Sequence, residues 1–134
     1  MKKLYYAAVM YAVLGLASGL FYREFTKMSE FSGYSELSVL HTHLLALGMM
    51  VMLIILALEK VFGLSKTKWF NLFYWHYNGG LLLTTGMMLV IGLQQVAGNA
   101  VTPMLAGMAG LGHILLTVAI AFLFTALGKR LDSK

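Results

Sequence analysis

Four long apolar stretches, separated by short polar segments, dominate this sequence of 134 residues. A helix needs roughly 20 consecutive apolar residues to cross the hydrocarbon core of a bilayer, which is about 30 Å thick. Each stretch reaches that length, and we place the spans near residues 4–22, 37–58, 69–93 and 103–127. Because the connections are short, neighbouring spans are expected to run antiparallel. The sequence therefore predicts an all-α fold, in which residues 1–134 form one integral membrane domain of four helices packed up and down.

The composition supports a membrane protein and excludes several chemistries. Hydrophobic residues make up 60% of the chain and charged residues only 11%, whereas soluble domains average roughly 45–50% apolar and about 25% charged residues. The chain has no cysteine, which excludes disulfides, thiolate metal ligands and cysteine nucleophiles. No carboxylate pair, phosphate-binding loop or nucleophile triad is present, so any enzymatic activity is expected to be of the oxidoreductase kind.

The basic residues predict the orientation of the chain. The chain has a net charge of +5, and its basic residues lie beside the apolar spans. This placement argues against a nucleic-acid partner and for the lipid bilayer. Cytoplasmic loops of membrane proteins are enriched in Lys and Arg. With the N-terminus inside, the inner segments carry eight such residues, and the outer loops hold only Arg23 and Lys27. We therefore expect a multi-pass protein of a bacterial plasma membrane with both termini in the cytoplasm. The first span exceeds the usual apolar length of a signal peptide, so we expect it to be retained.

All four histidines lie inside predicted spans, and ionisable residues there are functional-site candidates. His41 and His43 lie roughly 6 and 9 Å below the outer surface and His113 about 10–15 Å below it, at 1.5 Å per residue. His76 enters from the cytoplasmic side. We therefore expect an outer cluster of His41, His43 and His113, with His76 apart from it. The alternative for each histidine is a neutral ring that is hydrogen-bonded to a neighbouring helix.

The spacing of His41 and His43 restricts how they could bind a metal. Two residues along a helix correspond to a rotation of about 200°, so these two rings point in nearly opposite directions. The two rings of a single chain therefore cannot easily coordinate the same metal ion. Either two sites exist, or one site is shared between neighbouring chains, with His41 from one chain and His43 from the next.

The segment His41-Thr42-His43, followed by the apolar run 44–48, resembles the HxH helix of the central subunit of heme-copper oxidases and nitric oxide reductases. In that superfamily the two histidines ligate two hemes on either side of one helix, and twelve helices form three arcs of four. The resemblance implies that this chain corresponds to one arc, and that a cyclic homo-oligomer, a trimer above all, would resemble the whole core. The sequence lacks a second adjacent His-His pair and a His-Pro-Glu-x-x-Tyr segment, so a copper site is not implied. The whole chain also resembles a small family of four-span bacterial membrane proteins without a known activity.

These observations favour a heme b protein in which two histidines ligate the iron. Imidazole suits heme iron and gives a redox-active center, and the absence of cysteine requires non-covalent binding. The expected function is electron transfer, with a redox partner that the sequence does not identify, or binding of O2 or NO. Arg23, at the outer end of the first span, is the candidate partner for the heme propionates, unless it is only an interfacial anchor.

Small residues line parts of the spans. Gly15 and Gly19 form a GxxxG pattern, Gly79 and Gly80 are expected to interrupt the third span, and the glycines before His113 leave one side of the fourth span almost bare. Such patterns are typical of close helix packing. Glycine could instead make room for a flat macrocycle.

Two other functions remain open. Met104 and Met108 place two thioethers on one helix face, and soft sulfur ligands select Cu(I), which would suit a copper or other metal transporter. Packing is the alternative explanation, because methionine is frequent in this chain. A structural accessory subunit is the third possibility, and such a protein would tolerate the loss of all four histidines.

Overall fold

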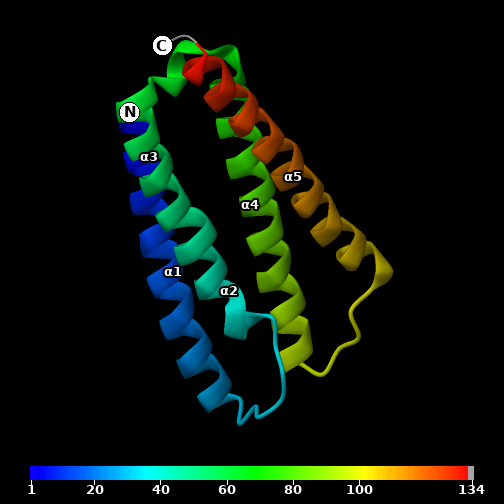
Figure 1. The fold of residues 1–134 in the computed structure, drawn as a ribbon. Coiled ribbons are helices and arrows are strands. Elements are labelled where there is room, and N and C mark those ends of the chain that lie inside the picture. Colours follow the sequence, from blue (N-terminus) through cyan, green and yellow to red (C-terminus); the bar gives the residue numbers. More distant parts are fainter. Residues whose placement is uncertain (133–134) are drawn as a thin grey trace.

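The computed structural model describes residues 1–132, which fold into four long helices (Figure 1). Part of the second long helix is π-helical, and a short 3-10 turn precedes the third. The elements are α1 (Lys2–Met28), α2 (Leu37–His43), the π-helical segment η1 (Leu44–Met50), α3 (Val51–Phe62), the 3-10 turn η2 (Leu64–Lys66), α4 (Lys68–Val96) and α5 (Pro103–Leu131). We refer to α2, η1 and α3 together as the second helix.

All four long helices are long and apolar enough to cross a membrane. They contain 26 to 29 residues, which corresponds to roughly 39–44 Å at 1.5 Å per residue. This length matches the hydrocarbon core together with the headgroup regions, about 40–45 Å. The four expected spans are therefore confirmed as helices, and each helix continues for a few residues beyond the apolar stretch that predicted it.

Local sequence explains where several helices begin and end. Thr67 and Thr102 precede α4 and α5, and each hydroxyl accepts a hydrogen bond from the amide three residues later, as N-cap residues do. Pro103 follows at the first position of α5, where its missing N–H costs nothing. Gly63 ends α3 with φ of 64°, a left-handed conformation that favours glycine.

The helices run up and down but do not close into a bundle. The start of α1 and the end of α5 lie at one end of the molecule (the terminal end), and the loops 29–36 and 97–102 lie at the other (the loop end) (Figure 1). α1 packs along the second helix, α4 packs on the second helix and on α5, and α5 packs mainly on α4. Accordingly, 17% of the most apolar stretch of α5 is buried, against 44% for α4. One flank of α5 is therefore without a neighbouring helix.

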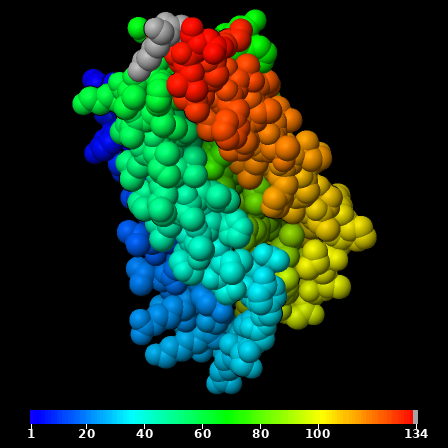
Figure 2. All heavy atoms as spheres, viewed as in Figure 1, coloured from blue at the N-terminus to red at the C-terminus, as the bar shows by residue number. Residues whose placement is uncertain are grey.

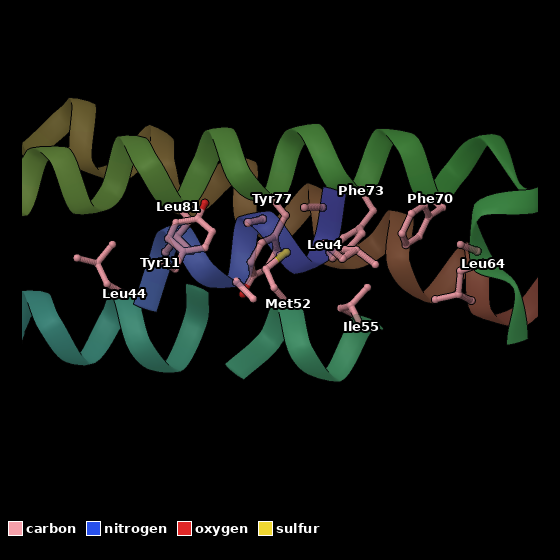
Figure 3. Close-up of a cluster of buried hydrophobic side chains, with 14 of the residues drawn as sticks. Leu4, Tyr11, Leu44, Met52, Ile55, Leu64, Phe70, Phe73, Tyr77 and Leu81 are labelled. Carbon is pink, nitrogen blue, oxygen red and sulfur yellow. The ribbon is translucent and has the colours of Figure 1, made fainter. Parts of the chain in front are cut away.

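The core lies between α1, the second helix and α4 (Figure 3). Tyr11, Met52 and Phe73 are fully buried there. A polar pair lies within it, because the Tyr11 hydroxyl donates to Asn78 Oδ1 over 2.8 Å. Buried polar groups without a partner are costly, so this bond satisfies two groups and joins α1 to α4.

The expectation that Gly79 and Gly80 interrupt the third span is wrong. α4 runs without a break through both residues. Gly80 instead lies against α5, where a Cβ would approach the Gly112 carbonyl oxygen to 2.9 Å, while a Cβ on Gly79 would meet nothing within 4 Å. Small residues let two helix backbones approach closely, so Gly80 and Gly112 allow the close contact between α4 and α5.

Candidate functional site

A hollow lies between the second helix and α5, with α4 at its floor (Figure 2). It exists because α5 packs on α4 and leaves the second helix uncovered on that side. The two walls are furthest apart toward the loop end (Figure 1).

His41 faces α1, and the rotation along the helix places His43 on the other side of the second helix. A Cβ placed on Gly19 of α1 would lie 3.6 Å from Cβ and Cγ of His41, so the His41 ring faces α1. His43 is rotated by about 200° from His41 and therefore points away from α1, to the side of the hollow. Its side chain is half-buried.

His113 borders the same hollow from α5, which follows from the positions of two other contacts. On α4, Gly92 packs against Leu37 of the second helix, and His76 lies 16 residues earlier, about 160° around the helix. His76 therefore faces away from the second helix, where its ring contacts Phe122 of α5. His113 is nine residues before Phe122, about 180° around α5. The His113 side chain therefore points back toward the second helix, and it is exposed.

Three of the histidines make the same kind of hydrogen bond, from the ring to the backbone of their own helix. Nδ1 lies 2.9 Å from the Val39 carbonyl oxygen in His43, 2.9 Å from that of Leu72 in His76, and 3.0 Å from that of Ala109 in His113. A carbonyl oxygen only accepts, so Nδ1 carries the proton and Nε2 keeps its lone pair. Metal-ligating histidines are typically oriented by this kind of bond. His43 and His113 thus present ligand nitrogens from the two walls of the hollow.

The expected cluster of His41, His43 and His113 does not form within one chain. His41 faces α1, its Nδ1 is buried without a hydrogen-bond partner, and its Nε2 lies 3.4 Å from the Thr42 hydroxyl. Within residues 1–132, no three His, Cys, Asp or Glu side chains come together around a possible metal position. The reason is the rotation between His41 and His43, which sends one ring to α1 and the other to the hollow.

Arg23 and the methionine pair also lie apart from the hollow. Arg23 is on α1, across the second helix, and is 77% exposed, with its Nε 3.7 Å from Glu24 Oε1. Met104 and Met108 are exposed on α5. Met104 is nine residues before His113 and therefore on the opposite side of α5. The thioethers and the histidines of the hollow do not form one set of ligands.

The sequence analysis missed the π-helical segment that directly follows His43. The Tyr77 hydroxyl donates to the Leu47 carbonyl in this segment over 2.9 Å. Gly48 lies so close to Tyr11 that a Cβ would approach the ring to 2.4 Å. π-helical turns are rare and occur frequently at functional sites. Gly48, an isolated glycine within an apolar run, is the one sequence signal for it.

Comparison with known proteins identifies a family for this chain. A family model described as a protein of unknown function (DUF2871) matches residues 1–130. The chain belongs to the DUF2871 family. No curated protein and no solved structure matches it. Membership of DUF2871 covers nearly the whole chain and assigns no activity, so the function of this family member has to be argued from the site.

Proposed function

We propose that this chain is a membrane protein that binds heme b in the hollow between the second helix and α5, where His43 and His113 would hold the iron. One observation supports the proposal above all. In both His43 and His113, Nδ1 donates to a backbone carbonyl, which leaves Nε2 as a ligand atom on each wall of the hollow. When bound, heme supplies the redox and gas-binding chemistry of its iron. With two histidine ligands the iron would have no open coordination position, so the expected role is electron transfer. Binding of O2 or NO would require one histidine to leave the iron.

The walls of the hollow suit a large flat ligand. Toward the loop end from His113, α5 carries Ala106 on nearly the same face and Gly110 about 60° away. Both are exposed, and a Cβ on Gly110 would meet nothing within 4 Å. Because these residues have almost no side chain, a macrocycle could lie close to the backbone of α5. The chain has no cysteine, so coordination and packing alone would hold the group.

A related arrangement places the iron between chains. The His41-Thr42-His43 motif resembles the HxH helix of heme-copper oxidases, where the two rings serve different hemes. In a cyclic homo-oligomer, such as a trimer, His41 of one copy and His43 of the next would ligate one iron, and Arg23 of a neighbouring copy could pair with the propionates. A contact between two different surfaces repeats until the ring closes. This arrangement makes His41 essential and His113 dispensable.

The orientation follows from the charges. Within residues 1–132, the terminal end carries seven Lys and Arg residues and the loop end two, and cytoplasmic segments are the basic ones. We therefore place the terminal end in the cytoplasm of a bacterial host. His43 and His113 then lie in the outer half of the membrane.

Heme retention in histidine variants tests the proposal and separates its two forms. Each variant is purified in mild detergent, and heme is counted by the pyridine hemochrome assay. If the iron lies in the hollow, His43→Ala and His113→Ala lose heme, while His41→Ala keeps it. If the iron lies between chains, His41→Ala and His43→Ala lose heme, while His113→Ala keeps it. His76→Ala, at a ring that faces away from the hollow, is the matched control. Unchanged heme in all four variants would overturn the assignment of the ligands.

A further inference from the structure

A second cavity lies at the terminal end, away from His43 and His113. Its volume is about 640 Å³. The lining comes from the start of α1, from η2 and from the first turn of α4. Its polar members are Lys3, Ser65, Lys66, Thr67, Lys68 and Asn71.

The cavity brings together Lys3, Lys66 and Lys68. The ion pair found within residues 1–132 joins Arg23 to Glu24 at the opposite end of the molecule, so none of the three lysines is paired with a carboxylate there. The nearby acid, Glu59, is buried and accepts hydrogen bonds from the backbone amide and the hydroxyl of Ser65. Three ammonium groups therefore border one concave surface, and among the described residues none of them forms an ion pair.

Two of the three lysines, Lys3 and Lys68, contact neighbouring side chains. Lys3 donates from Nζ to Asn71 Oδ1 over 3.3 Å, and the same Nζ lies 4.5 Å from the centre of the Tyr74 ring. Lys68 lies 5.5 Å from the centre of the Trp69 ring. Cations over aromatic faces are attracted to them. Ordering the lysines before a ligand binds reduces the entropy that binding costs.

Backbone and apolar groups complete the site. α4 begins at Lys68 and has 29 residues, so its first amides lack intrahelical partners and its N-terminus carries a partial positive charge. Phe70 and Leu72 also line the cavity, and Leu72 is 37% exposed on the surface of α4. A ligand with an anionic head and an apolar body fits a cavity that has both basic and apolar lining residues.

We infer that the cavity between η2, α4 and the start of α1 binds the phosphate of an anionic glycerophospholipid. Basic pockets beside membrane helices recognise such headgroups. A zwitterionic lipid brings its own ammonium group, which the three lysines repel. The acyl chains would follow the apolar surface of α4 into the bilayer. This site is independent of the heme proposal, since it requires only that the helices span a membrane.

Native mass spectrometry of the purified full chain in detergent tests the site with three probes. These are phosphatidylglycerol, phosphatidylcholine and inorganic phosphate. We expect the protein to retain phosphatidylglycerol, to bind phosphatidylcholine at least about tenfold more weakly, and to keep the bound lipid in millimolar phosphate. Equal binding of the two lipids would overturn the inference. Displacement of the lipid by inorganic phosphate would assign the site to a soluble anion and would overturn it too.

Matched charge variants show whether the cavity or the overall charge is responsible. The test variant combines Lys3→Gln, Lys66→Gln and Lys68→Gln. The control combines Lys2→Gln, Lys60→Gln and Lys129→Gln, which remove the same charge at the same end but outside the cavity lining. Each lysine near a membrane surface contributes about fivefold to the binding of anionic lipid, so we expect roughly a hundredfold loss in the test variant and little in the control. Equal losses in the two variants would show that overall surface charge, and not the cavity, binds the lipid, and would overturn the inference. Lys66→Arg keeps the charge and should bind the lipid as the wild type does.

Discussion

The hydroxyl of Tyr77 on α4 donates a hydrogen bond to the carbonyl of Leu47 over 2.9 Å. Leu47 lies in the π-helical segment that begins directly after His43. In a bilayer, a backbone carbonyl without an internal partner costs several kcal/mol. This one bond therefore connects the irregular backbone next to the candidate ligand with the helix at the floor of the hollow.

Replacing Tyr77 by Phe removes only the hydroxyl. We expect Tyr77→Phe to lower the free energy of unfolding by roughly 0.5–1.5 kcal/mol, the range for hydrogen bonds in proteins and membranes. Denaturation in mixed detergent micelles, followed by circular dichroism, measures it. Tyr6→Phe, at a tyrosine that is 65% exposed, is the control and should leave the midpoint unchanged. An unfolding midpoint of Tyr77→Phe equal to that of Tyr6→Phe would show that the bond does not hold this segment.

Two glycines on α5 separate helix packing from helix propensity. A Cβ on Gly112 would approach Thr84 Oγ1 to 2.2 Å, whereas one on Gly107 would meet nothing within 4 Å. We expect Gly112→Ala to destabilise the protein by about 1–3 kcal/mol through overpacking. Gly107→Ala should be neutral or stabilising by up to about 1 kcal/mol, because alanine favours the helix. The same denaturation assay measures both, and equal destabilisation would contradict the α4–α5 contact.

Glu59 stabilises the turn that follows α3. It is 7% exposed, and its Oε2 accepts from the Ser65 amide over 2.8 Å. We expect Glu59→Ala to cost about 1–3 kcal/mol, because a charge-assisted bond is lost. Glu24→Ala, at an exposed carboxylate, is the comparison and should cost less than about 0.5 kcal/mol. Both values come from the same unfolding measurement, and two similar values would argue against the role of Glu59.

The absence of cysteine makes the orientation directly testable. Single cysteines at Ser32 and Asn99, in the two loops of the loop end, should react with a membrane-impermeant maleimide in intact spheroplasts. A cysteine at Lys2, at the terminal end, should react only after the membrane is opened. The reverse pattern of labelling would place the histidines of the hollow in the cytoplasmic half.

The sequence predicted the helices well because length and hydropathy are local properties. The opposite directions of His41 and His43 were equally predictable, since they depend only on the rotation per residue. The placement of α5 was not, because it depends on the close contact of Gly80 with Gly112 across two helices. The π-helical segment was missed for a similar reason: it is accompanied by a bond from Tyr77, distant in the sequence. Which histidines border one space therefore required the tertiary structure.

The visible spectrum of the wild-type protein shows whether this chain binds heme. The protein is purified in mild detergent without added heme, and its spectrum is recorded in the oxidised and the dithionite-reduced state. We expect a red protein with a sharp α band on reduction, and about one heme b per chain in the pyridine hemochrome assay, as ligation by two histidines requires. A colourless protein that takes up no heme when hemin is added would contradict the account.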